Sequence, residues 1–429
     1  MKFLLVLLPM LLFFFLNSVE GNDEEKQIVD PDPTYTIIIE GYDWGAAVSK
    51  VILPLGRAVK IDKSEYTVEV KRSSKEYELG ANSLKGERGI TFAYRSDASG
   101  NRLDAGEFIT LVLSVSPEDI LDSPIQYLNG LNRWITYEMT ITHQPSKRTW
   151  YQEAERLMPE LDQFNLKGKF RYSDQLTMSY ADFQPPVAKE KSPLIIWLHG
   201  GGEGGKDATI PLLANKATNY ASPEIQAIFG GAYVLVPQSP GAWMHNASGV
   251  STWGREDDIY NQGLMALIHN YVESHPGIDR DRIYVGGCSN GGYMSVKLML
   301  LFPDYFAASF PSALAYKNEY IDDAGVELLK NIPIWFIQSQ DDPVTPADLT
   351  ATPLYKRLIK AGAQNVHYSL YDHVTDLTGF FGGNDYRYNG HFSWIYSHRN
   401  HCRLDYDKKP VMMNGKGVTV MEWLAAQRR

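Results

Sequence analysis

The chain has 429 residues and a net charge of −10. One hydrophobic core rarely organises a chain of this length, so two domains are expected. Charged residues make up 21% of the sequence and hydrophobic residues 44%, which is typical of a folded soluble protein. Since the balance is acidic and the sequence contains no lysine- or arginine-rich block, it argues against nucleic-acid binding and against a polybasic membrane patch.

Residues 1–21 have the pattern of a signal peptide. Lys2 precedes an apolar run from Phe3 to Leu16, and small or polar residues follow. The run is shorter than the roughly 20 apolar residues of a transmembrane helix, whereas a basic start and a small-residue exit are typical of a secretory leader. We expect a secreted protein, extracellular or periplasmic, with no membrane segment in its mature form. An N-terminal membrane anchor is the alternative.

Residues from about 33 to 143 alternate between apolar and polar positions. The apolar positions are Tyr66, Val68 and Val70; Ile90, Phe92 and Tyr94; Ile109, Leu111, Leu113 and Val115; and Ile135, Tyr137, Met139 and Ile141. Short alternating runs separated by turn residues predict antiparallel strands with one solvent-exposed face. We therefore expect an immunoglobulin-like β-sandwich over residues 24–145, with a stabilising or positioning role.

Beyond residue 146 the pattern becomes an alternation of strands and helices. Unbroken apolar runs at residues 194–198, 232–236, 283–285 and 334–337 are typical of parallel strands buried on both faces. The apolar positions at helical spacing between these runs are Ile259, Leu264, Leu267, Ile268 and Tyr271, and Met294, Leu298 and Leu301. Residues 146–429 are therefore predicted to form an α/β domain that binds ligands beyond the carboxyl ends of its strands.

A nucleophile elbow is predicted at Gly287-Cys288-Ser289-Asn290-Gly291. The motif Gly-x-Ser-x-Gly lies here between an apolar strand and a helical pattern. Such a strained turn lifts the serine hydroxyl above the sheet, and its glycines allow neighbouring backbones to approach. Ser289 is accordingly the predicted nucleophile.

Residues 199–205, His-Gly-Gly-Gly-Glu-Gly-Gly, form a glycine-rich loop directly after the run at 194–198. The loop lacks the Lys-Ser/Thr ending of a P-loop and the spacing of a dinucleotide motif. With an elbow later in the chain, it predicts an oxyanion hole made by the backbone N–H groups of Gly201 (or Gly202) and Asn290. A plain tight turn is the alternative.

A serine nucleophile needs a base, and a histidine base needs an anion that fixes its tautomer. Asp341 and Asp342 follow the predicted strand at 334–337. We choose Asp342 because Pro343 fixes the turn behind it, and Asp341 would then cap the loop.

The order Ser, Asp, His of α/β-hydrolases limits the base to histidines after Asp342. The candidates are His367, His373, His391, His398 and His401. His391 is favoured because it lies between a loop glycine and aromatic residues, and His401 is the alternative because it adjoins Cys402 as Ser289 adjoins Cys288. The tryptophans expected to line the cleft are Trp243, Trp253 and Trp394.

A metal site would be a competing use of the histidines. The sequence contains no His-Glu-x-x-His motif, and its two cysteines are too few for a structural zinc site of the usual kind. We therefore expect neither a metal nor an organic cofactor. An oxidising compartment would permit a disulfide between Cys288 and Cys402.

Four stretches together resemble one group of α/β-hydrolases, the predicted peptidases related to polyhydroxybutyrate depolymerase-like and feruloyl esterases. The stretches are 197–205, 286–292, Asp342-Pro343-Val344 and 390–394, and residues 41–54 are similar to the opening of an immunoglobulin-like domain found in some members. The resemblance implies that the Gly-His-x-Ser-Trp histidine, His391, is catalytic. In tannases and some feruloyl esterases, which the Cys288 and Cys402 positions resemble, a disulfide links the neighbours of the catalytic serine and histidine.

The sequence thus predicts a secreted serine esterase with a Ser289–His391–Asp342 triad, acting on small-molecule or polysaccharide-linked esters such as short-chain, feruloyl or acetyl esters. A serine peptidase of prolyl-oligopeptidase type is one rival, weakened by the lack of a propeller-length N-terminal region. A non-catalytic binding protein on a hydrolase fold is another. The sequence does not indicate an oligomeric state.

Overall fold

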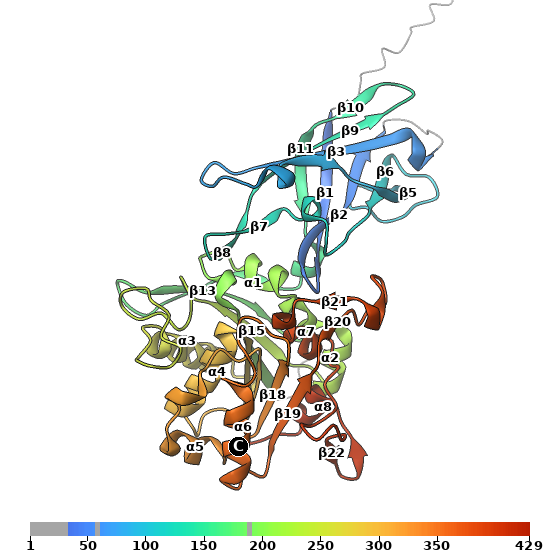
Figure 1. The fold of residues 1–429 in the computed structure, drawn as a ribbon. Helices are drawn as coiled ribbons and strands as arrows, with labels where there is room; N and C mark the ends of the chain where they lie inside the picture. The colour runs from blue at the N-terminus through green and yellow to red at the C-terminus, as the bar shows by residue number, and fades with distance from the viewer. Residues whose placement is uncertain (1–32, 56–60, 187–190) are drawn as a thin grey trace, which may run out of the picture.

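The computed structural model describes residues 33–55, 61–186 and 191–429, which form two domains stacked one above the other (Figure 1). The predicted signal peptide lies outside the described residues. None of the helices within the described ranges has both the length and the apolar character needed to cross a membrane.

The N-terminal domain is a sandwich of two β-sheets. A five-stranded sheet has the order β11-β1-β2-β6-β5, and a four-stranded sheet has the order β10-β9-β3-β4. The strands are β1 (Thr34–Tyr42), β2 (Gly45–Pro54), β3 (Tyr66–Ser73), β4 (Lys85–Glu87), β5 (Ile90–Ser96), β6 (Phe108–Leu113), β9 (Thr136–His143), β10 (Arg148–Trp150) and β11 (Gln152–Leu157). In β3 and β9 the predicted alternate residues face the core, as the two-residue period of a strand requires.

Two details of this domain differ from the sequence-based expectation. The sandwich continues past residue 145, because β10 pairs with β9 and β11 pairs with β1. Trp150 is buried in the sandwich, so this domain extends to about Leu157. Phe92 is 49% exposed rather than inward-facing, because the register of β5 shifts between Ile90 and Phe92.

The second domain has an eight-stranded sheet with the order β12-β13-β15-β14-β16-β17-β18-β19. Its strands are β12 (Asn165–Arg171), β13 (Thr177–Phe183), β14 (Ser192–Leu198), β15 (Tyr233–Gln238), β16 (Ile278–Cys288), β17 (Ala308–Ser312), β18 (Ile334–Ser339) and β19 (Val366–Tyr371). β12 and β13 are antiparallel to their neighbours, and the strands from β15 to β19 pair in parallel. This mostly parallel sheet is the predicted α/β-hydrolase architecture.

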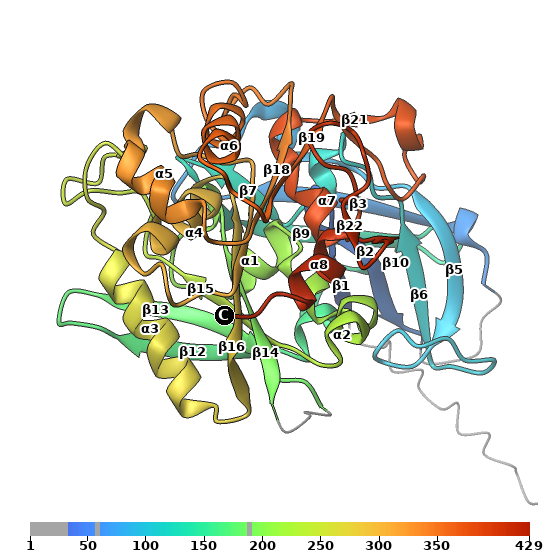
Figure 2. The same cartoon turned by 90° about the horizontal axis from the view of Figure 1, so that it is seen from below.

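Helices cover both faces of this sheet (Figure 2). They are α1 (Thr209–Ala214), α2 (Pro223–Phe229), α3 (Asn261–Ser274), α4 (Asn290–Leu301), α5 (Asp323–Leu329), α6 (Ala351–Lys360), α7 (Trp394–His398) and α8 (Val420–Ala425). Alternate residues of β14 supply two cores: Ile195 and Trp197 pack on one side, and Leu194 and Ile196 on the other. A strand buried on both faces must be apolar throughout, which explains the unbroken run in the sequence.

Four short strands form small hairpins in the hydrolase domain. They are β20 (Val374–Thr375) with β21 (Arg387–Tyr388), and β22 (Met412–Met413) with β23 (Lys416–Gly417). A further hairpin, β7 (Ile125–Leu128) with β8 (Leu131–Trp134), belongs to neither sheet of the sandwich and lies beside α1 (Figure 1).

Polar contacts hold the two domains together. Trp134 Nε1 donates to Thr209 Oγ1 at 3.2 Å, and Arg399 forms an ion pair with Asp43 at 2.9 Å. Asp43 lies in the turn between β1 and β2, and Trp134 ends strand β8, so this turn and the β7–β8 hairpin meet the hydrolase domain. The apolar cluster of the sandwich also continues into one face of the hydrolase sheet. The carboxyl ends of the hydrolase strands therefore lie next to the N-terminal domain.

Candidate active site

Ser289 occupies a strained turn between β16 and α4. Its φ of 54° lies in the left-handed region, which non-glycine residues rarely adopt. A Cβ on Gly287 would lie 2.5 Å from Gly291, and a Cβ on Gly291 would lie 1.9 Å from the Leu198 carbonyl oxygen. Both flanking glycines are therefore required by close backbone approach, as the elbow motif predicts.

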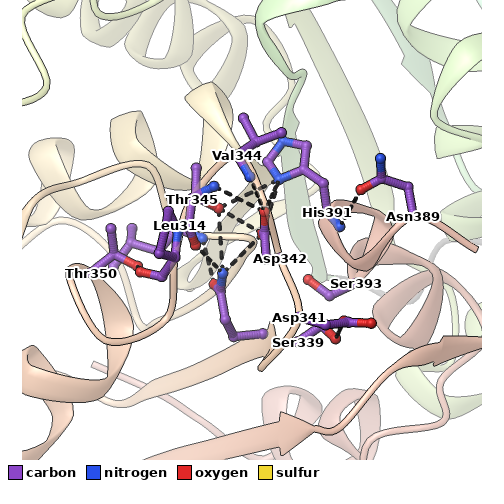
Figure 3. Close-up of polar contacts among 12 residues, drawn as sticks. Leu314, Ser339, Asp341, Asp342, Val344, Thr345, Thr350, Asn389, His391 and Ser393 are labelled. Carbon is purple, nitrogen blue, oxygen red and sulfur yellow. Dashed lines mark hydrogen bonds and ion pairs between the residues drawn. The ribbon is translucent and has the colours of Figure 1, made fainter.

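His391 contacts the buried carboxylate of Asp342. His391 Nδ1 lies 2.9 Å from Asp342 Oδ2 and 3.0 Å from Oδ1 (Figure 3). The histidine lies in a 3-10 turn, Gly390–Phe392, where its backbone N–H donates to Asn389 Oδ1. An imidazole that gives Nδ1–H to a carboxylate has Nε2 free as a base.

Asp342 is 4% exposed and surrounded by hydrogen-bond donors. Its carboxylate accepts from the backbone N–H of Val344 at 2.8 Å and of Thr345 at 2.9 Å, and from Gln338 Nε2 at 3.0 Å. Burial by itself raises the pKa of Asp342, but the hydrogen bonds from His391 and Thr345 outweigh it and hold the pKa below its usual value. The group is therefore ionised at neutral pH and suited to stabilise a histidine cation.

The alternative acid and base take other partners. Asp341 pairs with His373 at 2.8 Å. His401 is exposed and stacks on Tyr396, with ring centroids 5.4 Å apart. Neither Asp341 nor His401 lines the cavity that contains Ser289. His391 does line that cavity, and Asp342 lies behind it in contact with the His391 ring, so the preferred pair is the one next to Ser289.

The glycine-rich loop turns beside Ser289, and its backbone is fixed by His199. Ser239 N–H donates to His199 Nε2 at 3.1 Å, so Nδ1 must carry the proton and donates to the Gly200 carbonyl at 2.6 Å. Burial lowers the pKa of His199 to about 4, which keeps it neutral and in this tautomer. Because one peptide unit contains the Gly200 carbonyl and the Gly201 N–H, His199 also orients that N–H.

Gly201 and Asn290, the two predicted oxyanion donors, both line the cavity with Ser289. A Cβ on Gly201 would meet no atom within 4 Å, so its backbone faces open space. Asn290 is buried at the start of α4, and its Oδ1 accepts from the Met244 N–H at 3.3 Å. The N–H groups at the start of a helix lack intrahelical acceptors and are suited to bind negative charge.

The cavity has a volume of about 930 Å³ and is lined by residues of both domains. Its aromatic lining residues are Trp44, Tyr127, Trp253, Phe392 and Trp394. Trp243, which was also expected in the cleft, is fully buried and donates through Nε1 to the His199 carbonyl at 3.1 Å. It supports the glycine-rich loop from behind, and the expectation for this residue was wrong.

The possible disulfide between Cys288 and Cys402 is absent, since both cysteines are free and buried. Cys288 Sγ lies 3.6 Å from Asn215 Oδ1, and burial raises the pKa of its thiol well above the usual value. Cys402 is also fully buried, and burial raises the pKa of its thiol to about 12. Each thiol therefore packs separately as a small apolar group.

Sequence reasoning missed the contribution of the N-terminal domain to this cavity. Tyr127, Asn129, Gly130, Leu131 and Asn132 line it from the β7–β8 hairpin. The turn residues Asn129-Gly130 are a hairpin signal, but no local pattern indicates where a hairpin docks. Within the described residues, no group of three or more His, Cys, Asp or Glu side chains is placed to hold a metal ion.

Comparisons with known proteins agree with this architecture. Residues 34–153 match the family model of the esterase Ig-like N-terminal domain, and residues 184–378 match that of the Phospholipase/Carboxylesterase family. A search of curated proteins found no match. The crystal structure of a thermostable esterase is 24% identical, with a TM-score of 0.69, and the similarity covers 92% of this chain and 99% of that one.

Two other solved structures are similar to part of this chain. A ferulic acid esterase is 16% identical over 55% of this chain and 95% of its own, with a TM-score of 0.39. An acylaminoacyl peptidase of Pyrococcus horikoshii is 16% identical over 80% of this chain and 52% of its own, with a TM-score of 0.40. Residues 34–153 are thus similar to an esterase Ig-like N-terminal domain and residues 184–378 to the Phospholipase/Carboxylesterase family, and the chain is a serine ester hydrolase.

Proposed function

We propose that the enzyme cleaves uncharged carboxylic esters through an acyl-enzyme, with Ser289 as nucleophile, His391 as base and Asp342 as its anion. One observation carries the proposal. Ser289 and His391 line the same cavity, and His391 Nδ1 lies 2.9 Å from the buried carboxylate of Asp342. A serine at an elbow and a carboxylate-oriented imidazole in one cavity are the parts that acyl transfer requires.

In the proposed reaction, His391 Nε2 takes the Ser289 proton as the serine oxygen attacks the ester carbonyl carbon. The N–H groups of Gly201 and Asn290 stabilise the negative oxygen of the tetrahedral intermediate. The intermediate collapses as the imidazolium protonates the leaving alcohol. Water, deprotonated by His391, then attacks the acyl-enzyme and releases the acid.

The lining of the cavity supports an uncharged substrate with a bulky or aromatic part. Among the described residues, the cavity lining contains aromatic side chains but no lysine or arginine. Its two carboxylates are occupied, since Asp43 pairs with Arg399 and Glu203 accepts from Asn132. A substrate with a carboxylate or phosphate would find no cationic side chain there, so short-chain, acetyl and feruloyl esters fit better.

Substitution of Ser289 by alanine tests the proposal. Hydrolysis of 4-nitrophenyl acetate should fall at least about 10³-fold, and a fluorophosphonate should label the wild type but not the variant. Retained hydrolysis by Ser289→Ala would exclude Ser289 as the nucleophile. Parallel assays on methyl ferulate and on a peptide panel should show turnover of the ester alone.

We also propose that the enzyme is exported, on the support of the leader-like pattern in residues 1–21. Expression of the full chain in a secreting host should yield enzyme outside the cytoplasm whose first residue lies near Asn22. Recovery of the activity in the membrane fraction with an intact N-terminus would instead indicate an anchor.

A further inference from the structure

The β7–β8 hairpin of the N-terminal domain contacts the loop that carries the Gly201 N–H. Asn132 Nδ2 donates to Glu203 Oε1 at 2.6 Å, across the domain interface. A Cβ on Gly202 would lie 3.1 Å from Asn132 Nδ2 and 3.2 Å from the Tyr127 ring. The hairpin therefore lies directly against the 3-10 turn formed by Gly201–Glu203.

Glu203 is an unusual residue to find in this position. Its side chain is buried, and its Oε2 would lie 2.9 Å from a Cβ on Gly200, so the carboxyl group folds back over the start of the turn. Burial raises the pKa of Glu203 to about 7, although the hydrogen bond from Asn132 lowers it. A buried carboxyl group needs hydrogen-bond partners, and Asn132 supplies one from the other domain.

The remaining supports of the loop come from the hydrolase domain. The Glu203 carbonyl accepts from Gln238 Nε2 at 2.9 Å, and Gly205 N–H donates to the Ser239 carbonyl at 2.8 Å. These contacts hold the end of the loop, and His199 holds its beginning. The turn between them is closed by a long backbone contact, 3.4 Å from Glu203 N to the Gly200 carbonyl. The Glu203 side chain thus connects this turn to Asn132 of the N-terminal domain.

We propose that Asn132 of the N-terminal domain is a positioning residue for ester hydrolysis, because its side-chain amide holds Glu203 and thereby the turn that presents the Gly201 N–H. This inference rests on the proposed function, in which that N–H binds the oxyanion. If the amide is removed, Glu203 loses its partner and turns toward water. The Gly201 N–H then moves away from the position it must occupy in the transition state.

The test measures kcat and KM of the full chain on 4-nitrophenyl acetate. The acetyl group is small, so the loss of a distant wall contact should change KM little. Asn132→Ala should lower kcat about ten-fold or more and leave KM within about two-fold, because donor placement matters most in the transition state. Thr209→Val is the matched control, since it removes a different interdomain hydrogen bond, from Trp134, without touching the loop. The kcat of Thr209→Val should stay within about two-fold of the wild-type value.

A reciprocal exchange makes the test specific to this hydrogen bond. Asn132→Asp places a carboxylate against Glu203, and when it is assayed at pH 9, above the pKa of about 7 of Glu203, the two negative charges repel and kcat should fall as strongly as in Asn132→Ala. Adding Glu203→Gln to Asn132→Asp restores one donor and one acceptor of the same size, and kcat should return to within about three-fold of wild type. Titration of active sites with a fluorophosphonate expresses kcat per folded enzyme. If Asn132→Ala does not fold, comparison of Asn132→Asp with the exchanged pair decides the question.

Two results would overturn the inference: a kcat for Asn132→Ala within two-fold of wild type, or a lowered kcat in Asn132→Asp that Glu203→Gln does not recover. A trifluoromethyl ketone, which forms a tetrahedral adduct with serine, should bind Asn132→Ala less tightly in proportion to the loss in kcat/KM. Ser289→Ala is assayed in parallel. Activity in that variant refutes the proposed function, whereas an inactive Ser289→Ala with a normal Asn132→Ala refutes only the role of Asn132.

Discussion

The two walls of the active-site cavity are built in different ways. The hydrolase wall, defined by Ser289, Asn290, Gly201 and His391, lies at strand ends and helix starts above a buried sheet. The sandwich wall, defined by Trp44 and the β7–β8 hairpin, consists of a turn and a two-stranded hairpin outside the two sheets, and its Tyr127 is 61% exposed. Groups that carry out chemistry need fixed geometry, whereas a turn and a peripheral hairpin can vary in sequence without disturbing a core. We expect the reacting groups to lie on the first wall and substrate choice to depend on the second, whose Asn132 acts on catalysis only through the Glu203 side chain.

The largest expected effect comes from removing the anion behind the hydrolase wall. Asp342→Asn should lower kcat about 10⁴-fold, because an amide cannot stabilise the imidazolium and favours the wrong tautomer of His391. Steady-state kinetics on 4-nitrophenyl acetate would measure the loss. Asp341→Asn is the neighbouring control. Because Asp341 pairs with His373, this substitution should lower kcat by less than about two-fold. Equal losses in the two variants would contradict the assignment.

A buried histidine behind the hydrolase wall should make that domain sensitive to acid. His398 packs against Trp197, and burial, with Arg399 and Lys216, lowers its pKa to about 3. An unfolded histidine titrates near 6.5. The contribution of neutral His398 to the free energy of unfolding is therefore fully present above pH 6.5. It is lost as the pH falls toward 3, and the loss reaches about 3 kcal/mol at pH 4.

Urea unfolding at pH 7 and pH 4 checks this expectation. Between pH 7 and pH 4 the free energy of unfolding of His398→Leu should fall by about 3 kcal/mol less than that of the wild type. For a leucine substitution of the exposed His269, the fall should equal that of the wild type. An unchanged pH dependence in His398→Leu would show that other groups cause the acid sensitivity.

His199 should contribute to rate through the peptide that it orients. His199→Phe removes the donor to the Gly200 carbonyl and the acceptor for the Ser239 N–H. We expect kcat to fall about 10- to 100-fold with little change in KM, since a misplaced donor acts on the transition state. Ser239→Ala keeps the backbone contact and removes only the hydroxyl, 3.3 Å from Nε2, so its kcat should change far less. A rise in KM alone would argue against a role in placing the oxyanion donor.

The smallest effect is expected at Tyr127, on the exposed side of the sandwich wall. Tyr127→Ala removes an exposed ring that lines the cavity next to Gly202. The ratio of kcat/KM for methyl ferulate to that for 4-nitrophenyl acetate should fall about five-fold, which corresponds to about 1 kcal/mol of lost contact. Tyr151→Ala, another exposed tyrosine of the sandwich that does not line this cavity, serves as control. If kcat/KM falls by the same factor for both esters, the sandwich wall does not select the acyl group.

Local patterns predicted the strands and helices where burial follows a simple period. The fully apolar run of β14 and the alternating residues of β3 are two such cases. The domain boundary was misplaced because β11, with the sequence QEAERL, is polar, as suits a strand at the edge of its sheet. Its pairing with β1 joins residues more than 100 positions apart, so no local period reveals it.

The elbow could be predicted from local sequence, because the glycines around Ser289 are required by short-range sterics that a five-residue motif encodes. The sequence also predicted the order of nucleophile, acid and base along the sheet. The folded arrangement was needed to show which histidine contacts Asp342, that Cys288 and Cys402 are unbonded, and that Asn132 reaches Glu203. Asp342 and His391 are 49 positions apart, and Asn132 and Glu203 are 71 apart. Such pairs depend on how whole elements and domains pack, which residue type and spacing do not specify.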